Sequence, residues 1–63
     1  MSAPQDAVAR LRHDLANPLA AVLMETQLLL QQADRYDAET VASLQEIQAQ
    51  ARRMRNLLQS LSS

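Results

Sequence analysis

Apolar residues recur along the first half of the chain with the spacing of a helical seam. Intervals of three and four residues alternate through the series Val8, Leu11, Leu15, Pro18 and Val22, and Leu29 follows one full repeat of seven residues later. This alternation is typical of an amphipathic helix that packs against other helices. The pattern predicts a first helix over about residues 4–32, with Ser2 as its capping residue and Pro4 in its first turn.

The second half of the chain carries a more regular seam. One core position of this pattern holds Leu44, Ala51 and Leu58, and the other holds Thr40, Ile47, Met54 and Leu61. It predicts a second helix over about residues 38–61, with Asp37 as its capping residue. The polar segment of about residues 33–37 joins the two helices, and a connection this short makes them antiparallel neighbours.

The first helix has more apolar surface than one neighbouring helix can cover. Well over half of its circumference after the proline is taken up by Leu19, Val22, Leu23, Met24, Leu28, Leu29 and Leu30. We therefore predict an all-α fold in which residues 1–63 form one domain, an antiparallel helical hairpin that dimerises into a four-helix bundle. Glu25 falls on the seam and is expected at the edge of the bundle, because burying an unpaired carboxylate is costly.

Composition excludes several classes of protein. The chain has no cysteine, no glycine and a net charge of -1, with six basic and seven acidic residues. Disulfides and thiolate metal sites are therefore excluded, and the single histidine with scattered carboxylates has no metal-ligand spacing. No apolar run reaches the roughly 20 residues of a membrane span, and no basic excess favours nucleic acid. We expect neither membrane contact from this segment nor a nucleic-acid partner.

His13 is the residue best suited to chemistry. The seam places it on the side of the first helix opposite the core, and Asn17 lies one turn further along the same surface. An exposed imidazole next to a carboxylate suits a nucleophile, with Asp14 orienting the ring and accepting a proton. Asn17 is placed to hydrogen-bond a group transferred to the ring or to position a water. The alternative is that all three are ordinary surface groups.

Pro18 lies inside the predicted helix. It removes a backbone donor and crowds the carbonyl of Asp14, so we expect a kink just beyond His13. A proline in a helix interior costs about 3 kcal/mol, which favours a functional reason for keeping it. A kink that merely fits the bundle remains the alternative.

The segment His13-Asp14-x-x-Asn17-Pro18-Leu19 resembles the phosphoacceptor box of bacterial sensor histidine kinases, His-(Glu/Asp)-x-x-(Asn/Thr)-Pro-Leu, with every defined position filled. That box lies on the first helix of their dimerisation and histidine-phosphotransfer domain. The resemblance implies that His13 is phosphorylated from ATP and passes the phosphoryl group to an aspartate of a response regulator. It also implies that Asp14 assists phosphorylation, that Asn17 assists dephosphorylation of the regulator, and that Pro18 bends the helix between signalling states.

The resemblance covers the phosphoacceptor domain and none of the ATP-binding boxes of the family. Loops that hold phosphates depend on glycine, which this chain lacks. The chain itself should therefore bind no cofactor and should not autophosphorylate, and ATP and Mg²⁺ are expected through a separate catalytic domain. We expect a domain of a larger cytoplasmic or membrane-tethered kinase rather than a stand-alone module, because the second helix runs nearly to Ser62 and Ser63 without a stop signal.

Two surfaces near His13 are candidates for partner binding. Antiparallel helices bring residues whose numbers add up to about 71 to one level, which places Leu58 beside His13. A basic patch formed by Arg52, Arg53 and Arg55 then lies within a turn or two of His13, although a solvated helix face explains it equally well. On the first helix, the stripe that runs on from His13 and would face a receiver domain comprises Ala16, Asn17, Ala20, Met24 and Gln27.

A second class of function stays open at this stage. The same pattern suits a non-catalytic, homodimeric helical interaction module, in which core residues matter and His13 does not. Residue types leave further questions open as well: the signal, the cognate regulator, whether phosphorylation occurs within or between subunits, and whether the Pro18 kink is static or switches.

Overall fold

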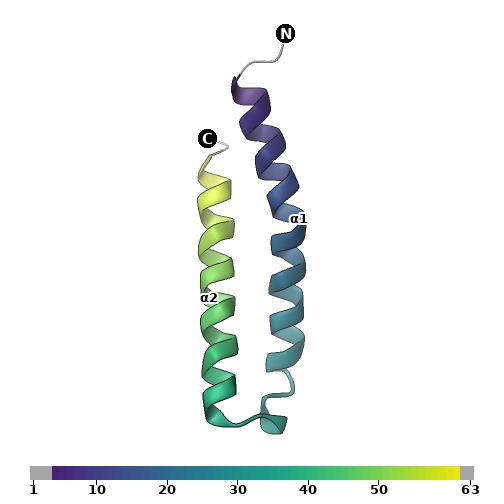
Figure 1. The fold of residues 1–63 in the computed structure, drawn as a ribbon, viewed down its shortest axis with the longest axis vertical. Coiled ribbons are helices and arrows are strands. Elements are labelled where there is room, and N and C mark those ends of the chain that lie inside the picture. The colour runs from purple at the N-terminus through teal and green to yellow at the C-terminus, as the bar shows by residue number, and fades with distance from the viewer. Residues whose placement is uncertain (1–3, 62–63) are drawn as a thin grey trace.

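The computed structural model describes residues 4–61, which form two long antiparallel helices (Figure 1). Helix α1 spans Pro4–Leu30, the single-turn helix η1 spans Ala33–Arg35, and helix α2 spans Ala38–Ser60. The hairpin measures 53 × 15 × 13 Å. The all-α hairpin predicted from the sequence is confirmed, as expected for a chain rich in Ala, Leu, Gln, Arg and Glu and free of glycine.

The ends of the helices differ slightly from the predicted ones. Helix α1 ends at Leu30, two residues before the predicted boundary, because the N–H of Gln32 donates to the Leu29 carbonyl in a tighter turn (3.0 Å). The 3₁₀ turn η1 occupies part of the segment predicted as a loop. Helix α2 ends at Ser60, one residue early. The predicted cap at Ser2 and the last two residues lie outside the described part.

Helix α2 begins where the sequence predicts it to begin. Asp37 has extended backbone angles, and its Oδ1 accepts a hydrogen bond of 2.8 Å from the N–H of Thr40. This bond satisfies one of the N–H groups that the first turn of a helix leaves unpaired. The carboxylate also lies at the positive end of the helix dipole, together with Glu39 in the first turn.

One face of each helix packs inside the hairpin, and we call this contact the hairpin seam. On α1 it includes the buried residues Leu19 and Thr26, and on α2 it is centred on Ala51, which is 1% exposed. Thr26 satisfies its hydroxyl by donating to backbone carbonyls of the preceding turn, at 2.9 Å for Val22. Half-buried positions complete the seam at Leu23, Leu30, Val41, Leu44, Gln48 and Leu58. The predicted core position at Leu44, Ala51 and Leu58 therefore does lie inside the hairpin.

The other predicted seam positions do not pack within the hairpin. They form an open apolar face whose side chains are 39–57% exposed, namely Val8, Leu11, Leu15, Val22, Leu29, Ile47, Met54 and Leu61. Leu15 of α1 and Met54 and Leu61 of α2 line the same shallow apolar groove, which shows that both helices contribute to one side of the hairpin. Each helix therefore carries two seams, and one of them has no partner within the described residues 4–61.

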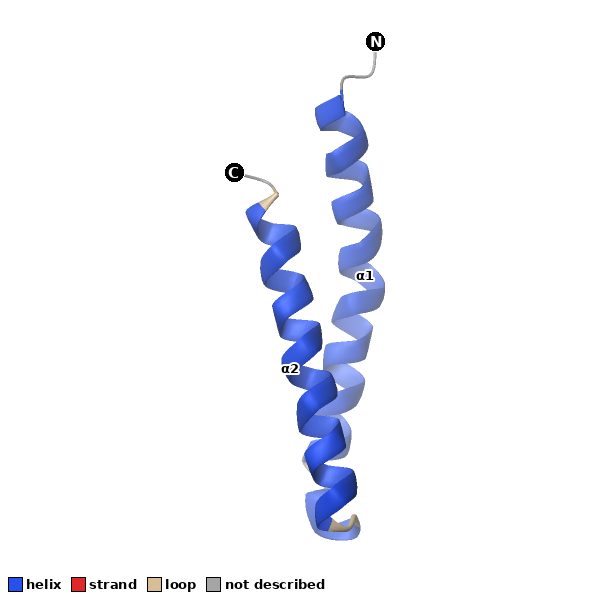
Figure 2. Cartoon of the chain, turned by 60° about the vertical axis from the view of Figure 1, so that its left-hand side comes forward, coloured by secondary structure: helices blue, strands red, loops and turns tan. Residues whose placement is uncertain are grey.

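Pro18 lies within α1, and the helix continues through it. Because proline has no N–H, the carbonyl of Asp14 lacks its usual helical hydrogen bond. Figures 1 and 2 both show that the N-terminal part of α1 is inclined to the remainder of the helix. This bend matches the kink expected from the sequence. Between residues 4 and 61, no helix combines the length and apolar character needed to span a lipid bilayer.

Candidate functional site

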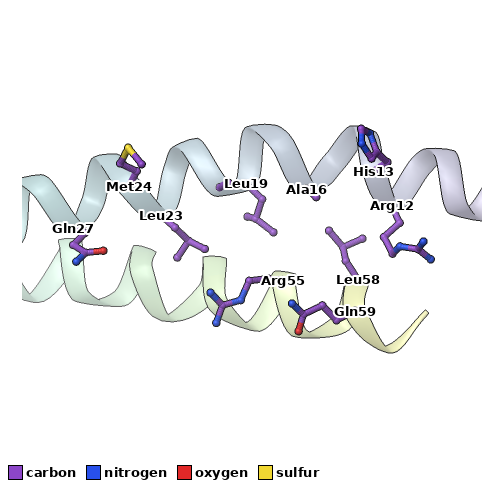
Figure 3. A pocket seen from close by; sticks show the side chains of 11 residues that line it. Arg12, His13, Ala16, Leu19, Leu23, Met24, Gln27, Arg55, Leu58 and Gln59 are labelled. Atoms are coloured by element: carbon purple, nitrogen blue, oxygen red, sulfur yellow. The ribbon is translucent and has the colours of Figure 1, made fainter. Parts of the chain in front are cut away.

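His13 lies on α1 with its side chain 79% exposed. Figure 3 shows the imidazole on the outer edge of α1, pointing away from α2. Its Nδ1 atom is 4.0 Å from Oδ1 of Asp14, whose side chain is also largely exposed. This separation exceeds hydrogen-bond range, so Asp14 contacts the ring only electrostatically, and only when the ring is protonated. The imidazole is therefore open to a large partner.

Asn17 and Pro18 lie on α1 in the turn that follows His13. Asn17 is exposed and is one helical turn from His13, so the two side chains share a surface. Pro18 is exposed as well and leaves the Asp14 carbonyl without a helical donor. The site thus combines an imidazole, a carboxylate and an amide on one to two turns of a bent helix.

A groove between α1 and the C-terminal half of α2 begins beside His13, and we call it the His13 groove. It has a volume of about 590 Å³. Leu19, Leu23 and Leu58 point into the space between the helices and form its floor (Figure 3). The complete lining consists of Arg12, His13, Ala16, Leu19, Ala20, Leu23, Met24, Gln27, Arg55, Leu58 and Gln59.

Several of the predicted site residues meet in this groove. His13 is joined there by five of the predicted partner-binding residues. Four lie on the first helix and one belongs to the basic patch, namely Ala16, Ala20, Met24, Gln27 and Arg55. Leu58 lies beside His13, as the antiparallel register predicts. Asp14, Asn17, Pro18, Arg52 and Arg53 do not line the groove, and all of them are exposed elsewhere on the helices.

Sequence reasoning missed two polar residues of the groove, Arg12 and Gln59. The antiparallel register that places Leu58 beside His13 also places Gln59 beside Arg12, because both pairs of residue numbers add up to 71. The register alone could therefore have identified these two residues. Arg12 was overlooked because it lies 100° around the helix from His13 and adjoins the hairpin seam, where it is half-buried. In the described part of the chain, no three His, Asp or Glu side chains come together in a way that would hold a metal ion.

Comparison with known families identifies the class of protein. The model of the His Kinase A (phospho-acceptor) domain matches residues 5–63. The match covers nearly the whole chain, and the chain belongs to this family. Comparisons with curated proteins and with solved structures returned no match.

Membership of this family indicates the general role of the hairpin. His Kinase A domains are the phosphoacceptor and dimerisation domains of histidine kinases, which are transferases of two-component signalling. These domains dimerise, typically into a helical bundle. Among residues 4–61, the side chains of the open apolar face are 39–57% exposed. This face is therefore available for the dimerisation that is typical of the family.

Proposed function

We propose that His13 is the phosphoacceptor of this domain. The observation that carries the proposal is an exposed histidine, followed by Asp14, Asn17 and Pro18 in the family's box, on the first helix of a chain that matches the phospho-acceptor family. A neutral ring nitrogen of His13 attacks the γ-phosphorus of ATP, so that an N–P bond forms and the bond to the ADP oxygen breaks. The proton on the other ring nitrogen stays or passes to a base.

Catalysis of this step requires a second domain that binds ATP and Mg²⁺. Exposure of His13 on the outer edge of α1 supports delivery of the γ-phosphate from such a domain. Asp14 is the group nearest to the ring that can accept a proton or stabilise an imidazolium, and small rotations of two exposed side chains would shorten the 4.0 Å separation. With ATP alone, the chain is not expected to label itself.

The phosphoryl group then passes to a receiver domain of a response regulator. An aspartate oxygen of the receiver attacks the phosphorus, the N–P bond breaks, and His13 regains a neutral ring. The His13 groove supports docking of such a partner, because the small side chains of Ala16 and Ala20 allow close approach and Met24 is 65% exposed. Asn17 is placed one turn from His13, where its amide would position the water that dephosphorylates the regulator.

The test is phosphoryl transfer to the purified chain from ATP, with a histidine-kinase catalytic domain supplied separately. Wild type should acquire an acid-labile, base-stable label, and His13→Gln should acquire none while keeping its helicity and dimer mass. Asp14→Asn should slow labelling by about 100-fold, the size of a typical general acid–base contribution. Asn17→Ala should accept label normally and slow the loss of phosphate from the regulator.

The same experiment separates this proposal from the second class of function. If a folded dimer takes no label from several catalytic domains, or if His13→Gln is labelled as well as wild type, His13 is not the phosphoacceptor. The chain would then act as a non-catalytic dimeric module, whose function depends on the open apolar face.

A further inference from the structure

The two halves of the hairpin carry opposite net charge. We call residues 4–18 and 52–61 the His13 half and residues 19–51 the loop half. The His13 half contains five arginines against two carboxylates, which gives a net charge of +3. The loop half contains one arginine against five carboxylates, which gives -4, and the two values add up to the -1 of the whole chain. Charge is therefore segregated along the 53 Å length of the hairpin.

The fold brings together arginines from both ends of the sequence. The C-terminal half of α2 lies beside the N-terminal half of α1 (Figure 1). Because Leu58 lies beside His13, the antiparallel register places Arg53 about 8 Å from His13 along the helix axis. The nearest carboxylates of the loop half are about 18 Å away along the same axis, at Glu25 and Glu46. Positive charge thus surrounds the level of His13.

Arg52 and Arg53 lie outside both packing surfaces of α2. Arg52 is about 100° around the helix from Ala51 of the hairpin seam, and Arg53 is about 100° from Met54 of the open apolar face. Both side chains are exposed, and neither lines the His13 groove. When the open apolar face is buried, these guanidinium groups lie at or beyond its rim and stay in contact with solvent. They therefore act on a partner of His13 through their electric field.

Segregated charge suits an acidic protein better than an extended polyanion. A nucleic acid or an anionic bilayer that lies along the hairpin would meet the net charge of -4 on the loop half. A protein that approaches His13 can present an acidic surface to the His13 half alone. The transfer proposed above also brings two anions together, the phosphoryl group on His13 and the aspartate of the receiver. Positive charge around their meeting point lowers the cost of that approach.

We infer that the His13 half is the docking end for a receiver domain with an acidic surface, and that the field of its arginines steers this association. The inference rests on the function proposed for His13 and names the chemistry of the partner. Arg52 and Arg53 steer the partner without touching the reacting atoms. The carboxylates of the loop half repel the same partner, so they favour docking at the end that carries His13.

The rate of phosphoryl transfer at different salt concentrations tests this inference. The chain is labelled by a catalytic domain, separated from it, and mixed with a receiver domain of net negative charge in a rapid-quench apparatus. Labelling under one fixed condition keeps the first reaction out of the measurement. The second-order rate constant of transfer should fall about tenfold between roughly 50 and 500 mM KCl, because salt screens the field.

Three variants separate the field from local contacts. Arg52→Gln combined with Arg53→Gln should lower the rate constant about fivefold at low salt and match wild type at high salt. Arg52→Lys combined with Arg53→Lys keeps both charges without the guanidinium shape and should transfer as wild type does. Arg35→Gln is the matched control, because it removes the same charge from an exposed position of the loop half, and it should stay within about twofold of wild type.

The outcomes distinguish this inference from the function on which it rests. A transfer rate that is independent of salt, or that falls equally in Arg35→Gln and in the double glutamine variant, overturns the inference and leaves the role of His13 intact. Absence of label on wild type, or of transfer from it, overturns the proposed function and the inference with it. Vesicles rich in phosphatidylglycerol should not bind the chain. Binding to them that the double glutamine variant abolishes would assign the arginines to a bilayer and overturn the inference.

Discussion

At the scale of single residues, Asp37 links the stability of the hairpin to pH. Hydrogen bonds from Thr40, first from its side chain and then from its backbone N–H, lower the pKa of the Asp37 carboxyl below its ordinary value. Its stabilising contribution is therefore fully present above the ordinary carboxyl pKa and is lost as the pH falls through the lowered pKa of the folded state. The start of α2 is expected to weaken in acid.

Substitution of Asp37 should isolate this effect. Asp37→Ala removes the cap at every pH and should lower the melting temperature by a few degrees at neutral pH. Asp37→Asn keeps an oxygen acceptor that does not titrate, so it should lose less stability in acid than wild type does. Circular dichroism melts from neutral pH to about pH 2 measure both effects. Parallel acid profiles for wild type and Asp37→Asn would show that this carboxylate carries none of the pH dependence.

At the scale of the helices, the sequence identified the seams but not the partner of each seam. The predicted core position that holds Leu44, Ala51 and Leu58 packs inside the hairpin, with Ala51 at its centre. The repeat of Leu15 and Val22, however, lies on the open apolar face. Apolar residues cover so much of α1 that several of its faces suit a neighbouring helix. Periodicity alone cannot decide between these faces, since that choice depends on packing against α2 and on the connection.

The part of the candidate site that lies on a single helix could be predicted from the sequence. The exposure of His13 and its surface shared with Asn17 depend only on helical geometry. The groove depends on how two helices meet, so the sequence did not indicate which residues of the basic patch line it. Arg55 lines the groove, whereas Arg52 and Arg53 do not, because successive residues on α2 point 100° apart.

Pro18 lies inside α1, where a proline is expected to lower the stability of the helix. Pro18→Ala supplies a backbone N–H for the Asp14 carbonyl and removes the clash of the ring, so it should raise the free energy of unfolding by up to about 3 kcal/mol. Urea denaturation measures this change. Gln45→Ala, an exposed substitution on α2, serves as the control and should stay within about 0.5 kcal/mol of wild type. A destabilised Pro18→Ala variant would instead mean that packing of the bundle requires the bend.

At the scale of the whole molecule, one hairpin buries too little to be stable alone. Among the side chains that the structure describes, three residues are buried, namely Leu19, Thr26 and Ala51. Among the same described residues, eleven large apolar ones are exposed. Domains of this size rarely supply enough core without a staple or a partner, and the chain has no cysteine to form a disulfide. Folding and dimerisation are therefore expected to be coupled, so that stability rises with protein concentration.

Two matched methionines allow the two exposed surfaces to be tested separately. Met54 lies on the open apolar face and is 50% exposed, whereas Met24 lines the His13 groove and is 65% exposed. Met54→Glu would bury a carboxylate between the subunits, which should raise the dimer dissociation constant roughly 100-fold or more and reduce helicity at low concentration. Met24→Glu introduces the same charge on the opposite surface and should leave the dimer mass unchanged. Sedimentation equilibrium measures both masses, and a monomeric Met24→Glu variant with a dimeric Met54→Glu variant would move the subunit interface to the His13 groove.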